Sequence, residues 1–466
     1  MRNTVAILGV PIDDLTLDET LGRIREFIQS GRFHQVATAN TDFLVRAMAD
    51  DGLRLILRQA DMVLADGMPV VWASRLMGTP LRGRVTGSDL VPRLATISAA
   101  AGYRIFMLGA RPEVAQAAKY RLEKDNPGIL IVGCLSPPLA GPLEMNNTEI
   151  LAAVEAAHPD ILLVAFGNPK QEKWIWMHRD RLKVPVCIGV GGTFDFIAGA
   201  SRRAPAWMQR SGFEWLHRLI QNPARLWRRY GTDIVKFTLF LANQMAAIQR
   251  PRSRQEDRVI CTKIENFCLI SLVGRLSGAS LEKIRSECDQ AINDGLEVVF
   301  DFHQADGLDC SAFGTLINLN KRASFKGKTI RLVGGHRAFN RMLRLFQADQ
   351  LFERYPTLAE ALADGERSAA GITVDQYDER LVVRLSWRRG GDVLNDLRRT
   401  LASLPPKVHE VIVNMEELHF TDIGLLGAVR EASVRNGVRI RLQPSQEIRG
   451  ELQRTGQEHL FDILTA

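Results

Sequence analysis

The chain has 466 residues, 46% hydrophobic and 24% charged, which is the composition of a globular protein with more than one domain. Its net charge of +7 is local, because residues 201–230 hold seven Arg and one acid. The six cysteines include no Cys-x-x-Cys pair, which disfavours a zinc site or a disulfide framework. The N-terminus does not have the pattern of a signal peptide, so secretion is not expected. No apolar run approaches the roughly 20 residues of a membrane span, so a spanning helix is not expected either.

Residues 1–200 alternate apolar strands with amphipathic helices. This alternation predicts a parallel, Rossmann-like α/β domain, in which ligands bind at the carboxyl ends of the strands. The strands are expected at residues 5–8, 35–39, 62–65, 104–108, 129–132, 161–165 and 186–190. A helix capped near Thr16 follows the first strand, and another helix starts near Thr86.

An acidic residue, Asp66, follows the strand at residues 62–65 and precedes Gly67. A carboxylate at that edge of the sheet can take a proton from a hydroxyl nucleophile, so Asp66 is a candidate general base. The alternative is that Asp66 caps the helix beginning near Met68. Asp66 alone favours the cap, and the rest of the first 230 residues shifts the balance toward the base.

Glycines follow three later strands: Gly109, Gly167, and the pair Gly191-Gly192. A strand followed by a small residue and a helix N-terminus is how backbone N–H groups meet a phosphate. Each of these turns is a weak signal alone, because many strand-to-helix turns contain glycine.

Residues 201–245 are basic and aromatic, with Trp207, Trp215 and Trp227 among the arginines. This composition suits an anionic bilayer surface, and it would also suit nucleic acid. The third reading is a helix that docks domains together and keeps a solvated basic face. Nucleic acid ranks lowest, because the charge lies in one short segment and not along a groove.

The composition turns charged near Arg250, where we expect a linker at residues 248–258. Two segments of strands and helices then repeat one pattern at a spacing of about 110 residues, which indicates a tandem duplication. We therefore expect domains at residues 1–200, 259–365 and 366–466, with the basic appendage at residues 201–247.

Eight short motifs occur in order in the first half, and together they resemble the bacterial WecG/TagA/CpsF glycosyltransferases over residues 3–245. They are Thr38–Asn40, Ala65–Gly67, Arg84–Leu90, Gly167–Glu172, Gly191–Asp195, Arg203–Pro205, Phe213–Leu216 and Arg225–Tyr230. The resemblance implies transfer from a UDP-sugar, commonly UDP-N-acetylmannosamine or its uronic acid. The implied acceptor is a polyprenyl-diphosphate-linked sugar on the cytoplasmic face of the membrane, in exopolysaccharide or cell-surface polysaccharide synthesis.

The family pattern also implies roles for individual residues. The matching base is Asp66, and the other active-site positions are Thr38, Asn40, Arg84 and Gln171. Asp195 is expected near the uracil, with Gly109, Gly167, Gly191 and Gly192 in the nucleotide-sugar site. Arg218, Arg225 and Arg228 of the appendage are expected to touch the membrane and the diphosphate.

Residue chemistry agrees with these roles, because displacing UDP needs a base and positive charge for the diphosphate. No Asp-x-Asp occurs in residues 1–245, so we expect no metal and no cofactor. The alternatives are a surface ion pair for Arg84 and hydrogen bonding at a turn or helix end for Asn40 and Gln171. A different class of function is a non-catalytic regulator that senses a nucleotide-sugar.

Each repeat of the second half resembles the STAS domain, the fold of anti-sigma factor antagonists, more in topology than in residues. The relevant segments are Asp309-Cys310-Ser311 and Asp422-Ile423-Gly424, each after an apolar strand. In the antagonists a Ser or Thr directly after the Asp is phosphorylated, so Cys310 and Ile423 cannot be switched in that way, and Ser311 is a weak candidate.

We expect the repeats to make protein contacts: docking on the transferase, self-association, or recruiting a partner. The alternative is a pair of structural spacers. His303, His336 and His419 lack metal-ligand spacing. The expected location is cytoplasmic, peripheral on the inner face of the membrane.

Overall fold

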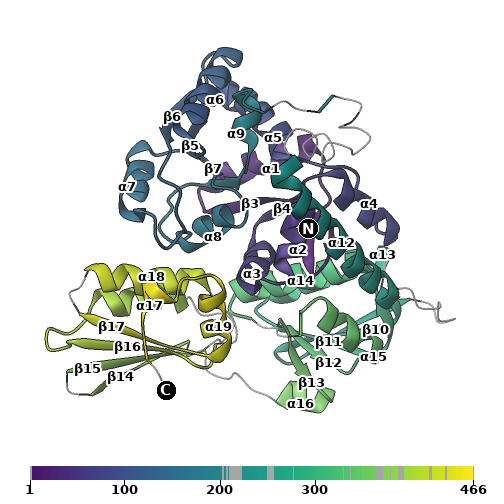
Figure 1. The fold of residues 1–466 in the computed structure, drawn as a ribbon. Coiled ribbons are helices and arrows are strands. Elements are labelled where there is room, and N and C mark those ends of the chain that lie inside the picture. The colour runs from purple at the N-terminus through teal and green to yellow at the C-terminus, as the bar shows by residue number, and fades with distance from the viewer. Residues whose placement is uncertain are drawn as a thin grey trace.

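Figure 1 shows the computed structural model of the chain, which is built of three α/β units and a long connecting helix. We call them the N-terminal domain (residues 3–201), the first repeat (257–363) and the second repeat (371–464). The structure describes residues 3–201, 204–205, 208, 223–248, 257–276, 278–328, 330–335, 337–349, 351–363, 371–377, 379–386, 393–418, 422–435 and 438–464.

The N-terminal domain is organised around an eight-stranded sheet of order β1-β2-β4-β3-β8-β7-β5-β6. From β2 onward every neighbouring pair is parallel, as the alternation of strands and helices predicts. The strands are β1 (Thr4–Ile7), β2 (Val10–Asp13), β3 (His34–Ala39), β4 (Met62–Ala65), β5 (Arg104–Gly109), β6 (Leu130–Leu135), β7 (Ile161–Ala165) and β8 (Val186–Gly189).

The first strand departs from expectation, because the chain turns at Leu8 and Gly9 and returns as β2, antiparallel to β1. Both turn residues have positive φ, 48° at Leu8 and 75° at Gly9. Nothing in the sequence analysis predicts β2, since its four residues Val10–Asp13 read as the continuation of one short apolar run.

Helices cover both faces of this sheet, and their starts follow the expected capping signals. Thr16 and Glu19 form a capping box at α1, and Thr86 caps α5 by accepting a hydrogen bond from the backbone N–H of Asp89. The helices are α1 (Leu17–Ser30), α2 (Thr41–Ala47), α3 (Asp51–Gln59), α4 (Met68–Leu76), α5 (Gly87–Ala101), α6 (Pro112–Asp125), α7 (Asn147–Ala157), α8 (Lys170–Met177) and α9 (Thr193–Ile197).

The two repeats have one topology, which confirms the expected duplication of pattern. In each five-stranded sheet the first strand is antiparallel to the second, and all other neighbours are parallel. The first repeat contains β9 (Arg258–Ile264), β10 (Phe267–Leu276), β11 (Glu297–Leu308), β12 (Ile330–Val333), β13 (Glu353–Tyr355), α13 (Ala279–Asn293), α14 (Cys310–Phe325), α15 (Arg337–Leu345) and α16 (Leu358–Ala363).

The second repeat contains β14 (Ile372–Tyr377), β15 (Arg380–Leu385), β16 (Glu410–Met415), β17 (Arg439–Pro444), β18 (Asp462–Ile463), α17 (Val393–Ala402), α18 (Ile423–Arg435) and α19 (Gln446–Arg454). Helices α14 and α18 occupy equivalent places in the sequence, because each connects the third strand of its repeat to the fourth. The edge strands β9, β13, β14 and β18 are short or polar, and they were not predicted from the sequence.

Helix α12 (Pro223–Ile248) connects the two halves and packs between α2 and α15. Phe237 and Leu241 are buried there. The amide of Gln244 is buried: its oxygen accepts from the N–H of Leu8 (2.9 Å), and its nitrogen donates to the carbonyl of Ala6 (2.9 Å) and to the sulfur of Cys310 (3.2 Å), which joins the two halves. This end of the appendage therefore has the domain-docking role that was one of the three readings of its composition.

Several expectations about the appendage fall on residues that the structure does not describe. Arg218, Trp207 and Trp215 lie outside the described residues, as do His336 and His419 of the repeats. Arg225 and Arg228 lie on α12, and their side chains are outside the description. Among the described helices, none combines the length and the hydropathy that crossing a bilayer requires.

The Gln244 contacts give a stability prediction. Replacing Gln244 by Ala leaves two buried backbone groups of β1 and its turn without their partner, so the free energy of unfolding should fall by about 2–4 kcal/mol. Urea denaturation of the full chain measures this. The neighbouring exposed Asn243 is the control, and Asn243→Ala should change little; equal effects of the two substitutions would contradict the prediction.

Candidate functional site

The candidate site lies at the carboxyl edge of the eight-stranded sheet. Because β4, β3, β8, β7 and β5 are parallel neighbours, the residues that follow them meet at one edge. Ala39 pairs with Ala65 in the sheet, so Asn40 and Asp66 leave adjacent strands side by side. The glycine turns after β7 and β8 begin at the same edge, which places Asp66 on the same side of the sheet as Gln171.

Asp66 is held by its backbone at the end of β4. Its N–H donates to the carbonyl of Ala39 (2.9 Å), and the residue is half-buried. The N-cap position of α4 belongs to Gly67, at φ 114°, and shows no side-chain cap hydrogen bond. Gly67, and not Asp66, is therefore the N-cap residue of α4, and Asp66 itself lies at the end of β4, the edge of such sheets where ligands bind.

Arg84 is brought to the same strand end by its neighbour, because the N–H of Val85 donates to the carbonyl of Ala65 (2.9 Å). The guanidinium of Arg84 lies 3.8 Å from the carboxylate of Asp89, and its side chain is 15% exposed. The alternative for Arg84 was an ion pair on the surface. The ion pair with Asp89 exists, but the Arg84 side chain is largely buried beside the site. A partly desolvated guanidinium binds an anion more strongly than an exposed one does.

Thr38 and Asn40 connect β3 to its neighbours. The hydroxyl of Thr38, which is buried, donates to the carbonyl of Gly189 (3.2 Å). The side-chain oxygen of Asn40 caps α2 by accepting from the N–H of Phe43 (3.1 Å). The side-chain oxygen of Asn40 thus makes the helix-end hydrogen bond that was the alternative to a role in the active site. This bond also fixes Asn40 at the edge that carries Asp66.

Gln171 joins two glycine turns. Its side-chain oxygen accepts from the N–H of Gly167 (3.2 Å) and from the N–H of Gly191 (2.9 Å). Gln171 is buried, and its side-chain nitrogen donates to Glu172 (2.7 Å). We call these contacts the Gln171 bridge. The bridge holds the turns after β7 and β8 in one arrangement, so turn hydrogen bonding, the alternative for Gln171, is what the structure shows.

Backbone conformation explains the glycines of this bridge. Gly167 has φ 79° and Gly191 has φ 53°, a region that side-chain-bearing residues rarely adopt. Gly109, at φ 101°, ends β5 so close to Phe166 that a Cβ there would lie 2.8 Å from its ring. Gly192 has an ordinary φ of −79°, so its backbone does not demand glycine.

One further predicted position, Asp195, is also placed. Asp195 is half-buried on α9, and its carbonyl accepts from the N–H of Ser201 (3.1 Å). Residue roles at the site follow from family resemblance and stay proposals.

Glu172 is a residue that the sequence analysis quoted in a motif without assigning it a role. Its side chain is fully buried, and burial raises the pKa of its carboxyl group to about 8. A Cβ on Gly189 would lie 2.4 Å from Oε1 of Glu172, so glycine is needed where β8 passes this carboxyl group. At neutral pH the carboxyl group is mainly protonated, so the acceptor of the Gln171 side-chain N–H is a neutral carboxylic acid. Only the burial, which is invisible in the sequence, distinguishes Glu172 from an exposed Glu.

Asn168 and Asp42 form a second link at the same edge, also missed from sequence. The amide nitrogen of Asn168 donates to Asp42 (3.0 Å), which also pairs with Arg46 (2.8 Å). This link ties the turn after β7 to α2, which begins beside Asn40. The site is thus built from turns that hold one another in place.

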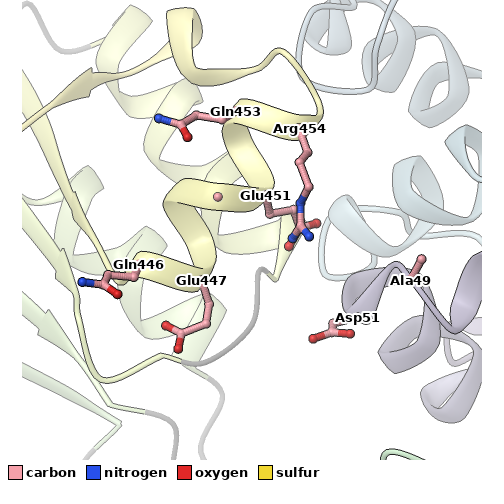
Figure 2. Close-up of a pocket in the computed structure, with 8 residues that line it drawn as sticks. Ala49, Asp51, Gln446, Glu447, Glu451, Gln453 and Arg454 are labelled. Carbon is pink, nitrogen blue, oxygen red and sulfur yellow. The ribbon is translucent and has the colours of Figure 1, made fainter.

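No group of three or more His, Cys, Asp and Glu among the described residues is arranged to hold a metal ion. A cavity of about 610 Å³ lies elsewhere, between the start of α3 and α19 of the second repeat. Figure 2 shows Ala49 and Asp51 on one side of it and Glu447, Glu451 and Arg454 on the other. None of the predicted site residues lines this cavity.

Comparison with protein families agrees with the two halves of the chain. The model of the glycosyl transferase WecG/TagA/CpsF family matches residues 5–251, and the STAS domain model matches residues 258–361, which is the first repeat.

Similar curated proteins include two N-acetylglucosaminyldiphosphoundecaprenol N-acetyl-β-D-mannosaminyltransferases. That of Staphylococcus aureus (strain MRSA252) is 31% identical over 229 residues, 49% of this chain and 87% of that protein. That of Bacillus spizizenii is 36% identical over 216 residues, 46% of this chain and 81% of that protein.

Solved structures similar to part of the chain include two anti-sigma factor antagonists. A putative one from Thermotoga maritima has a TM-score of 0.21 and 16% identity, and the match covers 22% of this chain and 91% of that one. One from Mycobacterium paratuberculosis has a TM-score of 0.22 and 17% identity, covering 24% and 96%.

The raised pKa of Glu172 predicts a pH dependence of stability. Between the ordinary value of 4.5 and about 8, the native state keeps a proton that the unfolded state releases, so the free energy of unfolding should fall as pH rises through this window. Because each pKa unit corresponds to about 1.4 kcal/mol, the loss should reach a few kcal/mol. Glu172→Gln should flatten this dependence.

Urea denaturation of the full chain at pH 5 and pH 8 measures the difference. Glu113→Gln, at an exposed position, is the control and should retain the wild-type dependence. The same loss between pH 5 and pH 8 in Glu172→Gln as in the wild type would contradict a protonated Glu172.

Proposed function

The chain belongs to the glycosyl transferase WecG/TagA/CpsF family, and from this we propose that it transfers a hexose or N-acetylhexosamine of the N-acetylmannosamine type from a UDP-sugar to a polyprenyl-diphosphate-linked glycan. The names of its relatives, which transfer N-acetylmannosamine to a lipid-linked N-acetylglucosamine, support this acceptor. The observation that carries the proposal is the position of Asp66, at the same sheet edge as Arg84 and the Gln171 bridge.

The proposed reaction is a single displacement with inversion. An acceptor hydroxyl attacks the anomeric carbon of the donor sugar while Asp66 takes the hydroxyl proton. The bond from that carbon to the diphosphate oxygen breaks, and UDP leaves with the electron pair. Arg84 stabilises the charge that develops on the diphosphate, assisted by Arg225 and Arg228 of the appendage.

We further propose that α12 brings the protein to an anionic membrane surface, where such an acceptor is found. One face of α12 packs on α2 and α15, while Ile234, Val235 and Leu239 are 40%, 58% and 59% exposed. An apolar strip beside a basic segment suits the boundary between headgroups and acyl chains. One face of α12 then docks the domains together, and another face of the same helix contacts the membrane.

The location that follows is the inner face of the cytoplasmic membrane, during synthesis of an exopolysaccharide or other cell-surface polysaccharide. The second repeat, which shares the strand order of the matched STAS domain, is proposed to be STAS-like as well.

Replacing Asp66 by Asn tests the general base. Turnover, measured as UDP release with a lipid-linked acceptor, should fall roughly 10²- to 10⁴-fold, because an amide cannot take the proton. Binding of UDP should change little. The control is Asp18→Asn, at a side chain that is 84% exposed. Near-normal turnover by a folded Asp66→Asn protein would remove Asp66 from the mechanism.

Charge reversal on α12 tests membrane attachment. The double variant Arg225→Glu, Arg228→Glu should lose sedimentation with vesicles that contain anionic lipid, since each basic residue near such a surface contributes about 1 kcal/mol. Arg111→Glu, at an exposed position on the N-terminal domain, should sediment as the wild type does. Unchanged sedimentation of the double variant would leave α12 with its docking role alone.

A further inference from the structure

The two repeats contact the N-terminal domain through equivalent helices. Helix α14 of the first repeat packs across β1 and β2, and helix α18 of the second repeat packs against α8. Figure 1 shows both repeats below the N-terminal domain, with α14 beneath α2 and α18 beneath α8. The same part of a duplicated fold therefore meets the same partner, the N-terminal domain, at two unrelated surfaces.

A glycine marks the closest approach at each surface. Gly314 and Gly427 are each the fifth residue of their helix. A Cβ on Gly314 would lie 3.0 Å from the carbonyl oxygen of Thr4, and one on Gly427 would lie 2.7 Å from Cγ of Met177. The sequences of both helices are therefore fitted to the contact that they make.

The helix starts are buried in the same contacts. Cys310 accepts from the amide of Gln244 (3.2 Å) and is fully buried, and Ile423 is also buried. Asp422, one residue before α18, pairs with Arg179 (3.6 Å). The position directly after the Asp is thus buried in both repeats, which leaves it closed to a modifying enzyme in this arrangement.

Ion pairs fasten the second repeat beside α8. Arg398 of α17 lies 2.9 Å from the carboxylate of Asp180 and donates to the carbonyl of Met177 (3.1 Å). Both charged side chains are largely buried, at 17% and 11% exposure. Arg181 and Glu431 form a second pair at 2.5 Å. Removing one member of a buried pair is costly, because the other charge is left without its partner.

Helix α19 of the second repeat is packed less closely against the N-terminal domain. The cavity of about 610 Å³ separates α19 from the start of α3 (Figure 2). Lys173 of α8 lies 2.8 Å from Asp50 and 4.0 Å from Glu451 across this gap. The contact of α17 and α18 with α8 is therefore the one that fixes the position of the second repeat.

Helix α8 joins this contact to the candidate site. Its eight residues span about 12 Å. Gln171, in its first turn, forms the bridge between the two glycine turns, and Met177, its last residue, meets Gly427 and Arg398. A shift of its C-terminal end that moves the helix as one body would also displace Gln171.

We propose that the second repeat is an intramolecular positioning module, whose hold on the end of α8 keeps the Gln171 bridge in its active arrangement. Its partner at this surface is the N-terminal domain of the same chain. The proposal rests on the proposed transferase function for its effect on turnover, but its effect on the bridge does not depend on the reaction.

The test is Arg398→Glu in the full chain, with two readouts. Hydrogen exchange of residues 167–172 and 189–192 should speed up, and the kcat of transfer should fall, each roughly 2- to 30-fold, with little change in the KM for the acceptor. The double variant Arg398→Glu, Asp180→Arg should restore both, because it recreates the pair with reversed charges. Arg399→Glu, at a side chain that is 79% exposed, should behave as the wild type.

The proposal is overturned if exchange speeds up only at residues 177–181 and in α17 and α18, while the glycine turns and kcat keep their wild-type values. If Arg398→Glu unfolds the second repeat, Gly427→Ala replaces it, with Gly450→Ala, whose added Cβ meets nothing within 4 Å, as the control. If the wild type transfers no sugar, the proposed function fails, and the exchange of the glycine turns still decides the positioning role.

Discussion

The hydrogen bonds of one buried amide hold the candidate site together. The side-chain oxygen of Gln171 accepts hydrogen bonds from the N–H groups of two glycine turns, and its side-chain nitrogen donates one to Glu172. The N–H groups of Gly167 and Gly191 lie outside the hydrogen-bond ladder of the sheet, and the Gln171 oxygen is the partner that they find. This bridge holds the turns after β7 and β8 in one arrangement at the edge that carries Asp66.

The rest of the chain is built around that edge. One hydrophobic cluster joins the β1–β2 hairpin, α2, α3 and α4 to α12 and the first repeat, and another joins the side of the sheet near α8 to the second repeat. Arg58 of α3, buried between the halves, donates to the carbonyls of Gly9 (2.8 Å) and Gln347 (3.1 Å). The repeats are thus packed onto the N-terminal domain through shared cores, which argues against simple spacers.

The sequence predicted the features that depend on local pattern. Alternating strands and helices indicate parallel strands, and this pattern alone is enough to place Asp66 at the same edge as Gln171. The pattern could not decide whether Gln171 and Asn40 contact substrate or hydrogen-bond a turn or helix end, because either role is compatible with the same residue at the same position. The neutral state of Glu172 and the docking of α14 and α18 arise from burial between distant segments, which no local pattern records. The strand β2 was missed because its turn lies within an apolar run.

We propose above that this edge transfers a sugar from a UDP-linked donor to a lipid-linked acceptor. Mass spectrometry of the acceptor after incubation of the full chain with a panel of UDP-sugars tests it most directly. The acceptor should gain the mass of one hexose or one N-acetylhexosamine with at least one donor. An unchanged acceptor with every donor, while the protein still binds a UDP-sugar, would contradict it and would favour a nucleotide-sugar sensor.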